Sequence, residues 1–265
     1  MLMANCSTGN GFRFFHVILA GGVLIAATSI GLAQVAPLAP KWLAGTPPPP
    51  VETFADGLAR HHVEPAEAAL IAALRDPDGE VRSLAAAQLA AMDDHPALPA
   101  ITRALEDERD PQVQVNLAGA ATWLGSRRGV DQLERICQDV NVPSTARLDA
   151  ARYVSHRELS TCVPAIDQIE RTDPDASVRV LALEAAVNYR GEADKAQALA
   201  ASALRDVEPM VRTAAADALR SLHATSAIGA LDRAMKIEGD DSVREHLRET
   251  MRVLRLSEEK HRGDG

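Results

Sequence analysis

Aromatic residues are scarce in this sequence of 265 residues, at 3% of the chain, although 46% of the residues are hydrophobic. Any core must therefore consist mainly of Ala, Leu and Val. β-Strands favour aromatic and β-branched residues, whereas closely packed helices accept small aliphatic ones. The composition predicts an all-α fold.

The sequence also lacks an excess of basic residues. It has 28 Lys and Arg against 37 Asp and Glu, a formal net charge of -9. An acidic surface repels a phosphate backbone, so we expect no nucleic-acid partner.

Long apolar runs are absent except near the start. Residues 14–33 contain no Asp, Glu, Lys or Arg and follow Arg13, with the small residues Gly31 and Ala33 before Gln34. This pattern predicts a signal peptide over residues 1–33. The alternative is an uncleaved membrane anchor, because residues 17–33 reach the lower limit of a bilayer span. Both readings place the remainder outside the cytoplasm, in the periplasm or the extracellular space.

Residues 34–50 are rich in proline and end in four consecutive prolines at 47–50. Such a segment favours extended polyproline II, so we interpret it as a linker, with a proline-rich ligand for a recognition domain as the alternative. Residues 51–64 predict a short amphipathic helix that caps the domain.

From residue 65 to residue 256 the pattern is a helical hairpin that recurs six times. The repeats align on Val81, Val115, Ala146, Val178, Val211 and Val243, and the interval between successive aligned positions is nearly constant. A period of about 32 residues is typical of a solenoid of paired helices rather than a bundle.

Two columns of this alignment predict how the helices pack. Four residues after the aligned position, five of the six residues are small, and Leu247 is the exception. Small residues there let helices of neighbouring repeats approach closely. The residues eight positions after the aligned position are expected to fill the space between the two helices of each repeat. They are Leu89, Trp123, Val154, Ala186, Leu219 and Met251.

Two polar columns flank the aligned position. The first, five residues before it, reads Asp76, Asp110, Asn141, Asp173, Asp206 and Glu238. The second, one residue after it, reads Arg82, Asn116, Arg147, Arg179, Arg212 and Arg244. With these motifs, residues 65–255 resemble HEAT-repeat proteins, specifically the short, Ala-rich repeats of the phycobilin-lyase-like group. The resemblance implies a right-handed α-α superhelix in which the acidic and Arg positions form a hydrogen-bonded ladder between repeats, with Asn116 and Asn141 as neutral departures.

The same acidic residues have a local interpretation. An Asp precedes Pro at Asp76, Asp110 and Asp173, which predicts a helix N-cap followed by Pro at the first helical position. We therefore treat the acidic column as structural and not catalytic.

The last repeat is polar on a face that the others bury, as Arg248 illustrates. A polar terminal repeat lets a solenoid end in solvent. The tail, residues 257–265, is expected to fray.

Few cysteines are present: Cys6, Cys137 and Cys162. Cys137 and Cys162 fall in the first helices of successive repeats at positions offset by about two helical turns, roughly 10 Å along the axis. Disulfide geometry needs closer Cα atoms. We therefore expect two buried free thiols, with a disulfide in an oxidising compartment as the alternative.

Reactive constellations are also missing. The histidines lack the helical spacing of a metal pair, and no phosphate-binding loop or nucleophile motif occurs. The deoxyhypusine hydroxylases, a related helical-repeat family, hold iron with His-Glu pairs, and this sequence has no His-Glu dipeptide. We expect no catalysis, no cofactor and no metal.

What remains is a surface. The second helices of repeats three to six carry polar residues at exposed positions, and we select Arg152, Glu184, Asp217 and Arg220 as candidate binding residues. They predict an exported scaffold or adaptor that binds a protein or peptide at the cell envelope. The alternative is an enzyme or cofactor-binding protein of the bilin-lyase-like or oxidoreductase-like type.

Overall fold

A computed structural model describes residues 53–155 and 160–263, and every regular element in those ranges is a helix. The predicted signal peptide and linker lie outside the described residues. No helix in the described ranges is long and apolar enough to cross a membrane. The fold class is all-α.

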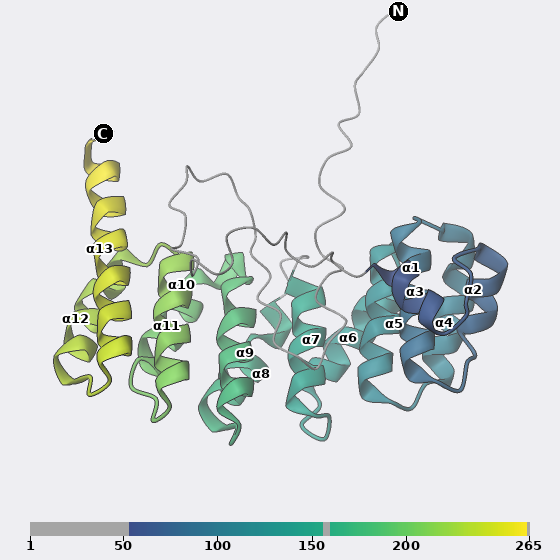
Figure 1. The fold of residues 1–265 in the computed structure, drawn as a ribbon, viewed down its shortest axis with the longest axis horizontal. Coiled ribbons are helices and arrows are strands. Elements are labelled where there is room, and N and C mark those ends of the chain that lie inside the picture. Colours follow the sequence, from purple (N-terminus) through teal and green to yellow (C-terminus); the bar gives the residue numbers. More distant parts are fainter. Residues whose placement is uncertain (1–52, 156–159, 264–265) are drawn as a thin grey trace, which may run out of the picture. The chain divides into compact units, whose positions relative to one another are not determined.

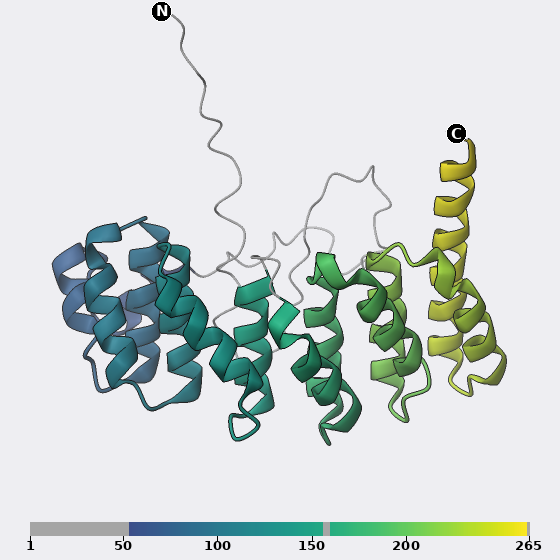
Figure 2. The ribbon, with the colours of Figure 1, turned by 180° about the vertical axis from the view of Figure 1, so that it is seen from behind.

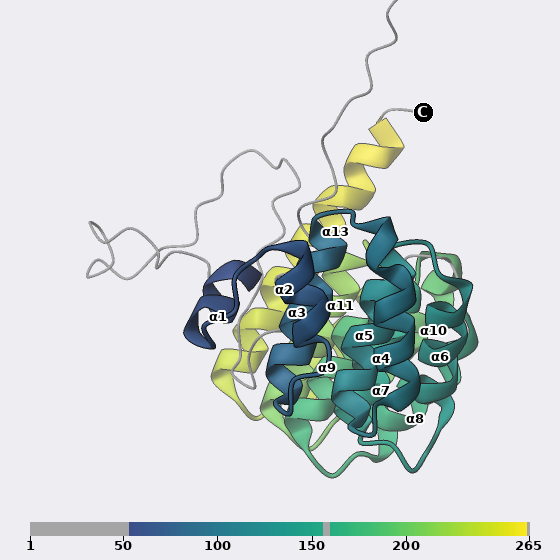
Figure 3. The same cartoon turned by 90° about the vertical axis from the view of Figure 1, so that its right-hand side faces the viewer.

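The chain divides into two compact units at residues 107 and 108, and each is described by itself. The first unit contains α1 (Phe54–Arg60), α2 (Glu67–Ala73), α3 (Gly79–Ala91), the 3-10 turn η4 (His95–Ala97) and α4 (Leu98–Asp107). In this unit α1 and α2 both pack on α3 (Figure 3). Thr53 and Asp56 form a capping box at the start of α1, and Leu58 is fully buried. The short helix thus covers the apolar side of α3.

The second unit contains the remaining helices, shown from teal to yellow in Figure 1. Its helices are α5 (Pro111–Trp123), α6 (Arg127–Gln138), α7 (Ser144–Ser155), α8 (Val163–Thr172), α9 (Ala176–Val187), α10 (Ala193–Ala203), α11 (Pro209–Ser221), α12 (Ile228–Ile237) and α13 (Asp241–Gly263). The 3-10 turns η5 (Ser160–Cys162), η6 (Arg190–Glu192) and η7 (Thr225–Ala227) precede α8, α10 and α12.

The second unit has two layers. Helices α7, α9, α11 and α13 lie side by side in one layer, and α6, α8, α10 and α12 lie in the other (Figures 1 and 2). Small residues permit the close packing between neighbours of the first layer: Ala150, Ala182 and Ala215 are fully buried. Below, the helix that comes second in each helical hairpin is called a second helix. The second helices are α3, α5, α7, α9, α11 and α13.

Gly119 lies where the Tyr153 side chain of α7 packs directly on α5. A Cβ atom built on this residue of α5 would lie 2.4 Å from Cζ of Tyr153 in α7. The aromatic ring therefore occupies the space that any other side chain at position 119 would need.

The cysteine prediction is wrong. Cys137 and Cys162 form a disulfide with their Cα atoms 5.7 Å apart, and both residues are fully buried. Helices in register would hold the two cysteines about two turns apart, but the end of α6 meets η5, the turn that leads into α8. A C-terminal and an N-terminal helix end are thus brought together.

Two other expectations differ from the structure. The tail predicted to fray from residue 257 is helical, since α13 continues to Gly263. Trp123, expected to fill the space within its repeat, is 43% exposed, whereas Ala121, two residues earlier, is 1% exposed. The second repeat is therefore shifted by two residues relative to the sequence alignment.

Candidate binding face and inter-repeat ladder

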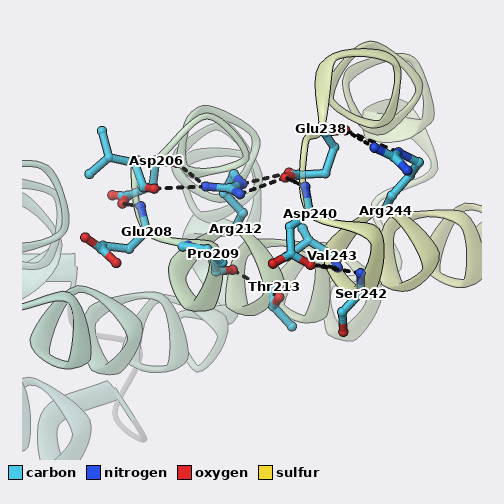
Figure 4. Close-up of polar contacts among 11 residues, drawn as sticks. Asp206, Glu208, Pro209, Arg212, Thr213, Glu238, Asp240, Ser242, Val243 and Arg244 are labelled. Atoms are coloured by element: carbon cyan, nitrogen blue, oxygen red, sulfur yellow. Dashed lines mark hydrogen bonds and ion pairs between the residues drawn. The ribbon is translucent and has the colours of Figure 1, made fainter.

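An ion-pair ladder joins the last three repeats. Arg212, near the start of α11, donates from Nε and Nη2 to the two carboxylate oxygens of Glu238, each at 2.7 Å (Figure 4). Its remaining terminal nitrogen, Nη1, donates to the Asp206 carbonyl at 2.9 Å. The guanidinium of Arg212 thus joins the turn before its own helix to the turn of the following repeat.

Arg179 makes the same arrangement one repeat earlier. It donates to both carboxylate oxygens of Asp206, at 2.9 and 2.8 Å, and to the Asp173 carbonyl at 2.9 Å. The side chains of Arg179 and Asp206 are 10% and 13% exposed. Because the fork geometry satisfies both partners, burial of these charges is compensated.

The pKa shifts of the ladder acids reflect this environment. Burial by itself would raise the pKa of Asp206, but the Arg179 hydrogen bond and the Glu208 amide outweigh it and the pKa is lowered. For Glu238, the Arg212 hydrogen bond is the largest influence and lowers the pKa, with burial opposing. Both carboxylates are therefore held in their charged form.

In each of the six repeats an acidic residue also closes the turn before the second helix. A carboxylate oxygen accepts the amide two residues on, and the pairs are Asp76–Asp78, Glu108–Asp110, Asp139–Asn141, Asp173–Asp175, Asp206–Glu208 and Glu238–Asp240. In repeats two and three the acids are thus Glu108 and Asp139, rather than Asp110 and Asn141.

Asp110 instead caps α5 by accepting the amides of Gln112 and Val113, as Asp78 and Asp175 cap their own helices. The interpretation of Asp76 and Asp173 as N-caps is therefore wrong, since the caps stand two residues later.

The donor of the second repeat is also different from the sequence prediction. Gln114 donates to the Glu108 carbonyl at 2.7 Å, just as Arg82 donates to the Asp76 carbonyl at 2.7 Å. Both donors lie six residues after the carbonyl that they bind. Gln114, and not Asn116, occupies the ladder position.

Arg147 departs from the ladder. Its Nε donates to the Cys137 carbonyl at 3.1 Å, and its Nη2 donates to Gln168 at 3.4 Å. No hydrogen bond or ion pair joins it to Asp173 within the described ranges. Burial lowers the pKa of Arg147, and the Asp139 carboxylate opposes this effect.

Arg244 ends the array. Its Nε donates to the Glu238 carbonyl at 3.2 Å, and its guanidinium pairs with Asp241 of its own helix. The acid that earlier arginines take from the next repeat is therefore supplied locally.

The candidate binding residues Arg152 and Glu184 lie together. Arg152 of α7 donates to Asp149 at 3.0 Å and to Glu184 of α9 at 3.3 Å. Gln112 of α5 donates to the same Asp149 at 3.0 Å. Side-chain hydrogen bonds thus run across three second helices, and the Glu184 side chain remains 59% exposed.

Asp217 and Arg220 form a separate group. Arg220 donates to Asp217 at 2.6 Å, and a ring nitrogen of His246 in α13 lies 3.0 Å from the same carboxylate oxygen. No hydrogen bond or ion pair joins this group to Arg152 or Glu184 among the described residues. We call the two groups, Gln112, Asp149, Arg152, Glu184, Asp217, Arg220 and His246, the polar strip.

A pocket opens between α8 and α10 on the other layer. Its volume is about 370 Å³, and its apolar lining includes Ile166, Tyr189 and Leu199. Two charged pairs stand at the pocket, Arg171 with Asp167 and Lys195 with Glu192. The size and the mostly apolar lining fit a small-molecule site. Within the described residues no group of three or more His, Cys, Asp or Glu is placed to hold a metal ion.

Glu170 is a buried acid that the sequence analysis missed. It is 3% exposed, and burial, followed by the neighbouring Asp206 carboxylate, raises its pKa to about 7. Glu170 lies three residues before the turn acid Asp173, and the same position holds Ile136 in the preceding repeat and Ala203 in the following one. A charged residue in an otherwise apolar column was the available signal.

Several solved structures are similar to this chain, among them two at 19% sequence identity. The chain is similar to human deoxyhypusine hydroxylase in complex with glycerol, with 19% identity, a TM-score of 0.40, and coverage of 77% of this chain and 76% of that one. It is also similar to the complex of CpcE and CpcF of phycocyanin lyase from a Nostoc species, with 19% identity, a TM-score of 0.37, and coverage of 71% and 94%. No curated protein matches the sequence significantly.

The family comparison concerns the first repeats. Residues 67–154 match the HEAT repeats family. The paired helices and ladder contacts that continue beyond residue 154 have the same plan. The sequence match to HEAT repeats thus covers residues 67–154.

Proposed function

We propose that this chain is a non-enzymatic scaffold or adaptor that binds a protein or peptide through the polar strip. The observation that carries the proposal is the set of hydrogen bonds that join charged side chains of neighbouring helices, above all the bond from the partly exposed Arg152 to the exposed Glu184. Side chains that are already held lose less conformational entropy when a partner binds. A surface with charges of both signs selects a partner whose charges are complementary.

The proposed site of action is the cell envelope. Residues 14–33 have the pattern of an export signal. The Cys137–Cys162 disulfide also favours an oxidising compartment. Fusion of residues 1–50 to a reporter that is active only outside the cytoplasm tests this part, and an inactive reporter would contradict export.

The binding test uses charge reversal on the strip. Glu184→Lys combined with Asp217→Lys should abolish recovery of a cross-linked envelope partner that the wild-type chain captures. The control is Asp131→Lys, which also reverses an exposed, ion-paired carboxylate, on α6 of the other layer. Equal recovery with all three chains would reject the strip as the binding surface.

A second candidate function is cofactor binding. The pocket between α8 and α10 favours it, because its volume of about 370 Å³ lies within the usual range of ligand sites. Native mass spectrometry and an absorption spectrum of the purified chain distinguish the two functions. A stoichiometric bound molecule would favour the cofactor-binding function.

A further inference from the structure

The junction between the third and fourth repeats lacks the ion pair that the next two junctions have. Arg179 binds Asp206, and Arg212 binds Glu238, each through two hydrogen bonds across a junction. Arg147 stands at the corresponding place, but its guanidinium binds the Cys137 carbonyl and Gln168. Asp173 corresponds to Asp206 and Glu238 and accepts the amide two residues on as they do, but in the described residues its carboxylate has no hydrogen bond or ion pair to Arg147.

A covalent bond crosses this same junction. Cys137 lies near the end of α6 in repeat three, and Cys162 ends the turn before α8 in repeat four. The diverted Arg147 donates to the carbonyl of Cys137 itself, so the missing ion pair and the disulfide meet at one residue. Thr161, next to Cys162, also bonds to Glu134 of α6 at 3.3 Å.

We propose that the Cys137–Cys162 disulfide takes the place of the ladder ion pair, so that the integrity of this junction depends on the redox state of the two cysteines. The proposal goes beyond the proposed function and does not rest on it. Reduction by a dithiol cleaves the Sγ–Sγ bond, transfers two electrons and two protons to give two thiols, and converts the dithiol to its disulfide.

Burial of both cysteines determines how this change occurs. Cys137 and Cys162 have no exposed surface, so a reductant reaches the sulfur atoms only when the junction opens locally. In an oxidising compartment the bond therefore persists and keeps α6 against η5. Under reducing conditions this junction becomes the first to open, while those held by Arg179 and Arg212 remain closed.

Hydrogen exchange with mass spectrometry tests the proposal on the full chain. Denatured wild-type protein should first show a mass lower by two hydrogens than its reduced form, and free thiols at Cys137 and Cys162 would overturn the proposal. In Cys137→Ala/Cys162→Ala, amides of α6 and α8 should exchange roughly 30-fold faster or more than in the oxidised wild type. Exchange in α11 and α13 should stay unchanged.

Two comparisons make the result specific. Wild-type protein folded in the oxidised form and then treated with a reductant should show the same exchange pattern as the double variant. This measurement tests the proposal even if the double variant does not fold. Arg179→Ala should instead speed exchange in α9 and α11 and leave α6 protected. Uniform acceleration in all helices after reduction, or no acceleration in α6 and α8, would overturn the proposal.

Discussion

Arg179 and Asp206 form a buried, two-fold hydrogen-bonded ion pair across a repeat junction, with N–O distances of 2.9 and 2.8 Å. Neither residue contacts the polar strip through a hydrogen bond or ion pair of the described chain. The pair therefore acts on the register of the repeats, whereas partner binding is assigned to different side chains.

Arg179→Ala should destabilise the protein by about 3 kcal/mol, because it leaves the buried Asp206 carboxylate without its cation. Equilibrium unfolding in urea measures the change. The control is Arg127→Ala, which breaks an exposed pair with Asp131 and should cost less than about 1 kcal/mol. Equal losses in the two variants would contradict a stabilising ladder.

Glu170 should make stability depend on pH. Its pKa rises from 4.5 to about 7 on folding, so its favourable contribution is complete below pH 4.5 and is lost as the pH rises through 7. The loss amounts to about 3 kcal/mol at most. The pKa values of Asp206 and Glu238 are lowered in the folded protein. These two acids therefore stabilise the fold at pH values above their unfolded pKa, and this stabilisation is lost as the pH falls through their folded pKa.

Glu170→Gln should therefore gain stability relative to wild type between pH 5 and pH 8, as measured by unfolding at several pH values. Glu184→Gln, at an exposed site, is the matched control. A Glu170→Gln difference that stays constant with pH would refute this account.

Gly119→Ala should lower the free energy of unfolding by about 1–3 kcal/mol, since the added Cβ overlaps the Tyr153 ring and forces α5 and α7 apart. Thermal unfolding measures the change. Gly239→Ala serves as the comparison, because no atom lies within 4 Å of its added Cβ. A Gly119→Ala protein as stable as Gly239→Ala would show that the ring moves freely.

Loss of the disulfide should cost about 3 kcal/mol, as expected from the entropy of closing a loop whose cysteines are 25 residues apart. Urea unfolding of wild-type protein with and without reductant measures it. The same reductant should leave Cys137→Ala/Cys162→Ala unaffected. Sensitivity of that variant would indicate an effect of the reductant other than on this bond.

The repeats and their helices were predictable from sequence because small apolar residues recur at a fixed period. The register of repeat two was not. Val115 and Asn116 match the sequence pattern of the other repeats, but Val113 and Gln114 are the residues that stand at the equivalent positions in the structure. Alignment on Val113 in place of Val115 makes the spacing of the six repeats almost uniform. Gln114 makes the hydrogen bond to a backbone carbonyl that Arg makes in other repeats, but it lacks the positive charge by which this column is recognised in the sequence.

The candidate site was only partly predictable. Charge at exposed helical positions indicated Arg152 and Glu184, whose contact spans two repeats. Gln112, Asp149 and His246 were missed because their contributions depend on partners in other repeats, far away in the sequence. The disulfide was missed because linear offsets along two helices do not show that one helix end meets the start of another.

The pairing of Arg244 with Asp241 bears on how long such an array becomes. Arg179 and Arg212 each bind a carboxylate from the next turn, but Arg244 finds its acid within its own helix. A single local exchange of partner thus closes the series of ion pairs. An acid three residues earlier in the same helix thus gives an arginine of this column an ion-pair partner without a carboxylate from another turn.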